Sequence, residues 1–144
     1  MKWKDAEEEF ENYWKKFGKS ATVFRFHDSF DAMGVTKSKT VRTTAQPSDF
    51  LVTHDGHTFF AEVKSSTNPS SFSLSNIRDA QWRQAMLTTA AKGLYLFYIR
   101  NETNGVWYKI PASFFLSLHK DGIKSVKWEA LTEYMFNLNK EFNV

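Results

Sequence analysis

Residues 47–64 read PSDFLVTHDGHTFFAEVK, two runs rich in β-branched and aromatic residues on either side of the pair Asp55-Gly56. Both central positions of a type I′ turn need a positive φ angle, which Asp and Gly tolerate, so the pattern predicts a β-hairpin. If the loop is symmetric about that pair, Asp49 faces Glu62 across the two strands. The stretch therefore predicts two carboxylates side by side.

This pair of carboxylates is a candidate metal site. Facing residues of an antiparallel pair have Cβ atoms about 4.5–5.5 Å apart, a separation at which two acids repel unless a cation lies between them. Mg²⁺ takes oxygen ligands and is often held by one or two carboxylates, waters and phosphate oxygens, so it is the expected ion, with Mn²⁺ as its substitute. Lys64 points to the same side of its strand as Glu62, where its ammonium group can orient or polarise an attacking water.

The spacing of Asp49, Glu62 and Lys64 resembles the signature of the PD-(D/E)XK nucleases, with the proline one place further from the aspartate than in the common form. Downstream, the chain is similar to the Phe-x-Leu-x-Asn segment and the His-Gln helix start of RecU-type Holliday junction resolvases, with Ala80 in place of the histidine. The matching residues are Phe72, Leu74, Asn76 and Gln81. The resemblance covers roughly residues 46–115.

The resemblance implies both a fold and an activity. The expected fold is α/β with a restriction-endonuclease-like core, a mixed β-sheet flanked by helices, and a projecting basic loop. The expected activity is Mg²⁺-dependent hydrolysis of phosphodiester bonds in four-way (Holliday) junctions during DNA recombination or repair. The site residues that it implies are Asp49, Glu62 and Lys64 as catalytic groups, Val63 as a metal ligand through its carbonyl, and Gln81 as a group that binds a water or a phosphate oxygen.

Symmetric cutting of a four-way junction needs two active sites, so a twofold homodimer is expected. Two other functions stay open. The chain can be another PD-(D/E)XK endonuclease, of restriction or repair type, that acts on duplex or single-stranded DNA. It can also be a non-catalytic DNA-binding module in which Glu62 and Lys64 merely form the solvated face of an amphipathic strand.

Residues 4–17 carry apolar residues at three- and four-residue steps and predict an amphipathic helix. Glu7 falls inside the apolar stripe, where an ionised carboxylate is costly unless it is paired or binds a metal. The segment is also similar to the first-helix acidic motif of archaeal-type and phage-type junction resolvases, whose first glutamate matches Glu7 and implies a further metal ligand. In the alternative interpretation Asp5, Glu7 and Glu8 only complement the helix dipole, and Glu11 is the substitute ligand.

The basic residues are unevenly distributed, although the net charge is only +3. Residues 15–42 hold most of the cations of the first third of the chain, directly before the proposed metal hairpin, where they can bring a phosphate backbone to the carboxylates. Residues 27–46 predict a long loop or projecting arm, which corresponds to the stalk of RecU-like proteins. The alternative is a flexible surface loop that has no function. The candidate DNA-binding residues are Arg25, Lys37, Lys39 and Arg42.

The remaining elements are expected from their periodicity and punctuation. The expected elements are a strand over residues 22–26, a helix over 77–91 capped by Asn76, a buried strand over 94–99, a strand over 106–110, a short helix after Pro111 and a final helix over 128–142. The helix between two strands indicates a βαβ-like unit.

Length and composition set the outer bounds. The chain has 144 residues, 42% hydrophobic and 24% charged, which fits one nuclease domain over residues 1–144. It has no Cys, so a disulfide framework and a thiolate metal site are excluded. The first residues lack the apolar region of a signal peptide, and no apolar run reaches membrane-spanning length. A soluble cytoplasmic protein is therefore expected. It would lie in the cytoplasm of a bacterial cell, or of the host cell if the gene is phage-encoded.

Overall fold

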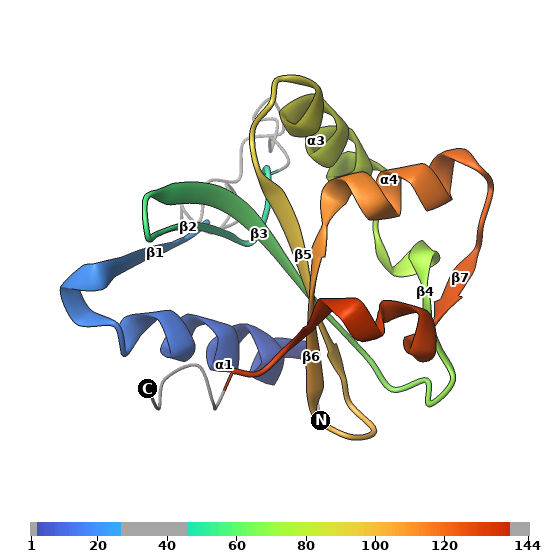
Figure 1. The fold of residues 1–144 in the computed structure, drawn as a ribbon, viewed down its shortest axis with the longest axis horizontal. Coiled ribbons are helices and arrows are strands. Elements are labelled where there is room, and N and C mark those ends of the chain that lie inside the picture. The colour runs from blue at the N-terminus through green and yellow to red at the C-terminus, as the bar shows by residue number, and fades with distance from the viewer. Residues whose placement is uncertain (1–2, 27–45, 139–144) are drawn as a thin grey trace, which may run out of the picture.

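The computed structural model describes residues 3–26 and 46–138, and it is built around a six-stranded mixed sheet (Figure 1). The strand order is β1-β2-β3-β5-β6-β8. These strands are β1 (Ala21–Arg25), β2 (Phe50–His54), β3 (His57–Ser66), β5 (Tyr95–Asn101), β6 (Val106–Pro111) and β8 (Met135–Phe136). A second, two-stranded sheet pairs β4 (Ser71–Ser73) with β7 (Ser125–Lys127).

Helices cover both faces of the large sheet. Helix α1 (Trp3–Lys15) packs on one face, and helices α3 (Asp79–Ala90) and α4 (Ala112–Lys120) pack on the other. Short 3₁₀ helices span Gly18–Ser20, Leu74–Asn76 and Trp128–Tyr134. The expected α/β architecture, a mixed sheet flanked by helices, is confirmed.

The hairpin of β2 and β3 has the expected turn and register. Asp55 and Gly56 have φ angles of 52° and 78°, as a type I′ turn requires. The pairing runs from His54 opposite His57 to Phe50 opposite Ala61. Because side chains alternate along β3, successive residues of this strand point to opposite faces of the sheet.

Strands β3 and β5 are parallel and joined through α3, so the expected βαβ-like unit is confirmed. Strand β5 lies between β3 and β6 and is almost entirely buried, which explains why residues 95–99 are apolar on both faces. Leu94, where the strand was expected to begin, precedes it and is 46% exposed. Its antiparallel partner β6 and the following helix α4 also match the expected elements.

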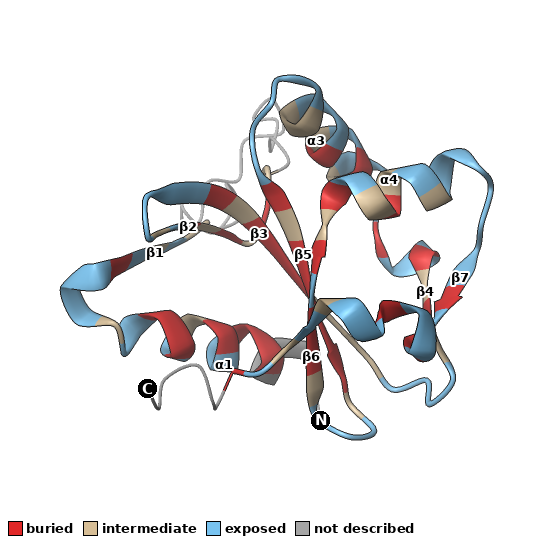
Figure 2. Cartoon of the chain, viewed as in Figure 1, coloured by how far each residue is buried: buried red, intermediate tan, exposed pale blue. Residues whose placement is uncertain are grey.

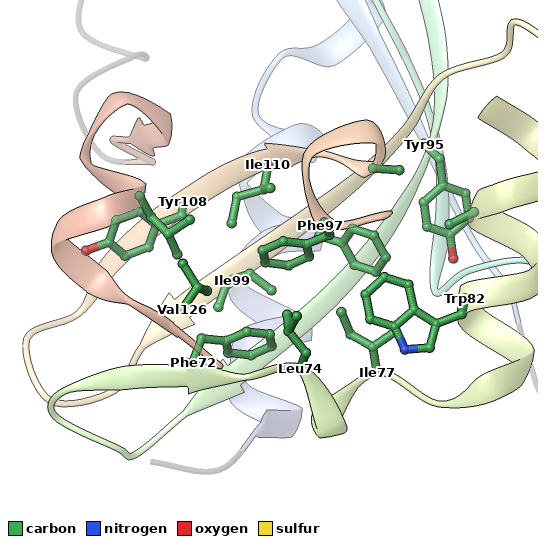
Figure 3. Packing of buried hydrophobic residues seen from close by; sticks show 14 of the residues in the cluster. Phe72, Leu74, Ile77, Trp82, Tyr95, Phe97, Ile99, Tyr108, Ile110 and Val126 are labelled. Atoms are coloured by element: carbon green, nitrogen blue, oxygen red, sulfur yellow. The ribbon is translucent and has the colours of Figure 1, made fainter. Parts of the chain in front are cut away.

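The hydrophobic core consists of one cluster on each face of the sheet, visible as the buried centres of the strands (Figure 2). Under α3 and α4, Phe72, Leu74 and Trp82 pack against the β5 residues Phe97 and Ile99 (Figure 3). Phe72 is fully buried and Trp82 is 7% exposed. The aromatic residues near the signature therefore serve as core packing.

The start of helix α3 differs from the sequence prediction. Asn76 ends a 3₁₀ helix and does not cap α3, which begins at Asp79 and not at Ile77. Ile77 has an extended backbone and is 3% exposed, so its burial in the core interrupts the helix. Arg78 is the residue at the N-cap, and its backbone N–H donates to Oε1 of Gln81 at 2.9 Å.

The prediction of a final helix over residues 128–142 is wrong. Residues Trp128–Tyr134 form a 3₁₀ helix, and β8 then pairs with the edge strand β6. Leu131 is buried on the α4 side of the sheet, whereas Leu138 is buried on the α1 side. A single helical stripe cannot face both sides, so the chain crosses the edge of the sheet instead.

Some expected features fall outside the described part of the chain. The basic loop expected over residues 27–46 lies almost entirely there, and so do Lys37, Lys39 and Arg42. Within the described residues, no helix is both long enough and apolar enough to cross a membrane.

Candidate active site

The residues of the signature meet in a pocket of about 320 Å³. Its walls come from α1, the bend before β2, the end of β3 and the start of α3. The lining residues are Glu7, Asp49, Glu62, Val63, Lys64, Ser65, Asn76, Arg78 and Gln81. The structure thus brings together the six residues expected at the site: Glu7, Asp49, Glu62, Val63, Lys64 and Gln81.

Asp49 and Glu62 lie side by side, as the hairpin register requires. Asp49 lies in the bend one residue before β2, and its carboxylate accepts a hydrogen bond from the backbone N–H of Val63 at 2.8 Å. Burial raises the pKa of both carboxyl groups, and for Glu62 the negative charge of Asp49 adds to this effect. Because the two acids lie next to each other, ionisation of both at once is disfavoured.

Gln81 and Lys64 both contact one oxygen of the Glu62 carboxylate. The amide Nε2 of Gln81 donates to Oε2 of Glu62 at 2.6 Å, and the Lys64 ammonium lies 3.5 Å from the same oxygen. The carbonyl end of the Gln81 amide accepts the Arg78 backbone N–H. Both ends of this amide therefore contact protein groups, and Gln81 ties the start of α3 to the carboxylate of Glu62.

Glu7 is buried and faces the same pocket, as its place in the apolar stripe indicates. Its side chain is 6% exposed, and Nη2 of Arg25 lies 2.6 Å from Oε1 of Glu7. Burial, with a contribution from the charge of Asp49, raises the pKa of Glu7 to about 7, although Arg25 partly opposes this effect. Such burial speaks against a purely helix-dipole role for Glu7.

Arg25 and Glu11 form the outer part of this cluster. Nη1 of Arg25 lies 3.4 Å from Glu11, whose carboxylate also pairs with Lys15 at 3.2 Å. Glu11 does not line the pocket, so Glu7 is the better placed of the two acids. Arg25, expected to bind DNA, is here ion-paired with both glutamates.

The donor set fits a hard divalent cation. Within the described part of the chain, no three acidic or histidine side chains are grouped around one point. Mg²⁺ nevertheless needs only one or two carboxylates in addition to waters and phosphate oxygens. A divalent cation bound here would neutralise the two neighbouring carboxylates together. Asp49 and Glu62 therefore suit such an ion, whereas Glu7 is engaged by Arg25.

Three of the lining residues were not expected in the pocket from the sequence. They are Ser65, Asn76 and Arg78. Ser65 directly follows the signature lysine, so its position was available from the sequence. Arg78 carried no signal, because the break between the 3₁₀ helix and α3 determines where its side chain lies.

No protein-family model and no curated protein matches the chain. Among solved structures, the chain is similar to the Holliday junction resolvase Hjc of Archaeoglobus fulgidus, with a TM-score of 0.48 and 11% sequence identity. The similarity covers 78% of this chain and 75% of that chain. At this TM-score and identity the likeness carries no argument about activity.

Proposed function

We propose that the protein is a metal-dependent nuclease that hydrolyses phosphodiester bonds in DNA. The observation that carries this proposal is the pair of neighbouring carboxyl groups, the half-buried Asp49 and the buried Glu62, in an open pocket that also contains the Lys64 ammonium. Pairs of titratable groups with raised pKa values in a pocket are typical of functional sites.

Each residue has a role that follows from its contacts. Asp49 is oriented by the Val63 N–H and Glu62 by Gln81, so both carboxylates are held ready to bind Mg²⁺, with the Val63 carbonyl as a further oxygen. When bound, the ion would stabilise negative charge on the phosphate oxygens and lower the pKa of a water. Lys64 orients the attacking water and offsets the charge that develops on the phosphate. Glu7 lines the same pocket and is the candidate ligand for a second ion, which would have to displace Arg25 from it.

Replacing Gln81 by alanine should lower kcat for DNA cleavage about 10- to 100-fold, because Glu62 loses the hydrogen bond that orients it. KM should change little, since the Gln81 amide contacts protein groups. The matched control is Gln84→Ala, on the same helix but outside the pocket lining. Steady-state kinetics of the two variants test this role, and a wild-type kcat for Gln81→Ala would remove it.

The finer proposal is that the substrate is a four-way junction and that a homodimer supplies the two active sites. It is supported by the junction-resolvase-like pattern of the sequence, two residues of which, Asn76 and Gln81, line the pocket. A duplex-cutting or single-strand-cutting nuclease remains the second candidate, because the pocket chemistry is the same. A non-catalytic module is less well supported, because the side chains of Glu62 and Lys64 are only 3% and 17% exposed and so do not form a solvated face.

One experiment separates these functions. Purified protein is incubated with a labelled four-way junction or a matched linear duplex, in Mg²⁺ or in EDTA. We expect Mg²⁺-dependent cutting of the junction, with the linear duplex left largely intact. Equal cutting of both substrates would remove the junction proposal and keep the nuclease. No cutting of either substrate, or of a labelled single strand tested alongside them, would remove the nuclease proposal itself.

A further inference from the structure

The pocket lining combines acids with neutral and cationic groups. The acids are Glu7, Asp49 and Glu62. The other side chains that line it include Lys64, Ser65, Asn76, Arg78 and Gln81. A nuclease pocket must bind a polyanion next to its acids, so it needs a cationic group that can bind a phosphate.

The backbone aims Arg78 away from the core and toward this pocket. Ile77 and Arg78 both have extended backbones, so their side chains point in opposite directions. Ile77 is anchored in the core beside Trp82 (Figure 3), and Arg78 consequently lines the pocket. Gln81 links the Arg78 N–H to Glu62, so the arginine is held at a set position relative to the acids.

The two cations of the pocket differ in what they already contact. Lys64 is paired with Glu62 at 3.5 Å. Arg78 is exposed, and its guanidinium makes no ion pair with another described residue. It is therefore available to an anion from outside, and a guanidinium can bind two oxygens of one phosphate at once.

We infer that Arg78, with the neighbouring Asn76 amide, binds a non-bridging oxygen of a substrate phosphate. This inference rests on the proposed function and assigns a substrate-binding residue to the same pocket. With three carboxylates against two cations, the lining carries one net negative charge when all are ionised. A divalent cation would reverse that sign, and loss of one carboxylate charge, as in Glu62→Gln, would cancel it. In either state Arg78 can bind the phosphate without a net negative charge opposing it.

Direct binding measurements test this role without relying on cleavage. Arg78→Ala and Arg78→Lys are made on a Glu62→Gln background, and their affinities for the fluorescein-labelled junction and duplex are measured by fluorescence anisotropy in EDTA over a range of salt. The matched control is Arg83→Ala, an exposed cation on the same helix outside the pocket lining. We expect about tenfold weaker binding for Arg78→Ala, an intermediate loss for Arg78→Lys, and a salt slope reduced by about 1 for Arg78→Ala.

Kinetics of single variants of the wild-type chain test the role of Arg78 separately from the proposed nuclease activity. Arg78→Ala should raise KM about tenfold with little change in kcat, and Arg83→Ala should alter neither. If the wild type cleaves DNA, two results would overturn the role of Arg78 and leave the nuclease proposal intact. In the first, Arg78→Ala binds and cleaves as well as the chain with Arg78. In the second, Arg78→Ala and Arg83→Ala lose affinity to the same extent. A wild type that binds junction and duplex but cleaves neither in Mg²⁺ would overturn the nuclease. The anisotropy comparison would then still decide whether Arg78 binds phosphate.

Discussion

Replacing Glu62 by glutamine should reduce DNA cleavage by at least about 10³-fold while leaving the protein folded. Lys64 and Gln81 both contact the carboxylate at this position, and Asp49 lies beside it, so it is the centre of the site. Lys64→Ala should have a comparable effect, because no other cation lies as close to Glu62 among the described ion pairs. Single-turnover cleavage in Mg²⁺ measures both losses.

The fold of the Glu62→Gln variant is the necessary control. A glutamine at this position can accept the Gln81 hydrogen bond and donate to Asp49, and it removes the cost of ionising a buried acid. The free energy of unfolding should therefore be equal to or higher than that of the wild type at neutral pH. Glu133→Gln, at an exposed position, should cleave normally. A Glu62→Gln protein with wild-type cleavage would show that Glu62 has no catalytic role.

Raising the pH from about 5 to about 8 should destabilise the protein in the absence of divalent cations. An acid whose pKa is raised by folding holds its proton more tightly in the native state, so its contribution is complete below the unfolded pKa and is lost as the pH rises through the folded value. For Glu7 this window runs from 4.5 to about 7. The loss from this group is of the order of 3 kcal/mol, and the raised pKa values of Asp49 and Glu62 act in the same direction.

Urea unfolding at a series of pH values measures this slope. Glu7→Gln should flatten it between pH 5 and 7, whereas Glu8→Gln, at an exposed position of the same helix, should leave it unchanged. An unchanged slope in Glu7→Gln would show that Glu7 does not titrate in this range.

Mg²⁺ should oppose this loss of stability, because the ion binds the deprotonated carboxylates. The rise in Tm on adding Mg²⁺ should therefore be larger at pH 8 than at pH 6, and Glu62→Gln should remove most of it. A Tm that does not respond to Mg²⁺ at either pH would contradict the proposed metal site.

Much of the candidate site could be predicted because it lies on locally determined elements. The Asp-Gly turn sets the register of the hairpin, and the alternation of side chains along a strand then brings Asp49, Glu62 and Lys64 together. Helical periodicity placed Glu7 on a buried face in the same way. The position of Gln81 was expected only from a family resemblance, and its contact with Glu62 depends on how α3 packs against β3.

The sequence by itself determined the elements whose signal is local: the amphipathic first helix, the type I′ hairpin, and the buried strand that follows helix α3. Only the tertiary structure decided the break at Ile77, the crossing of the sheet edge by the C-terminal segment, and the pairing of Glu7 with Arg25. Each of these depends on burial or charge contacts between residues far apart in the chain. Such contacts leave no periodic pattern in the segment that they reshape.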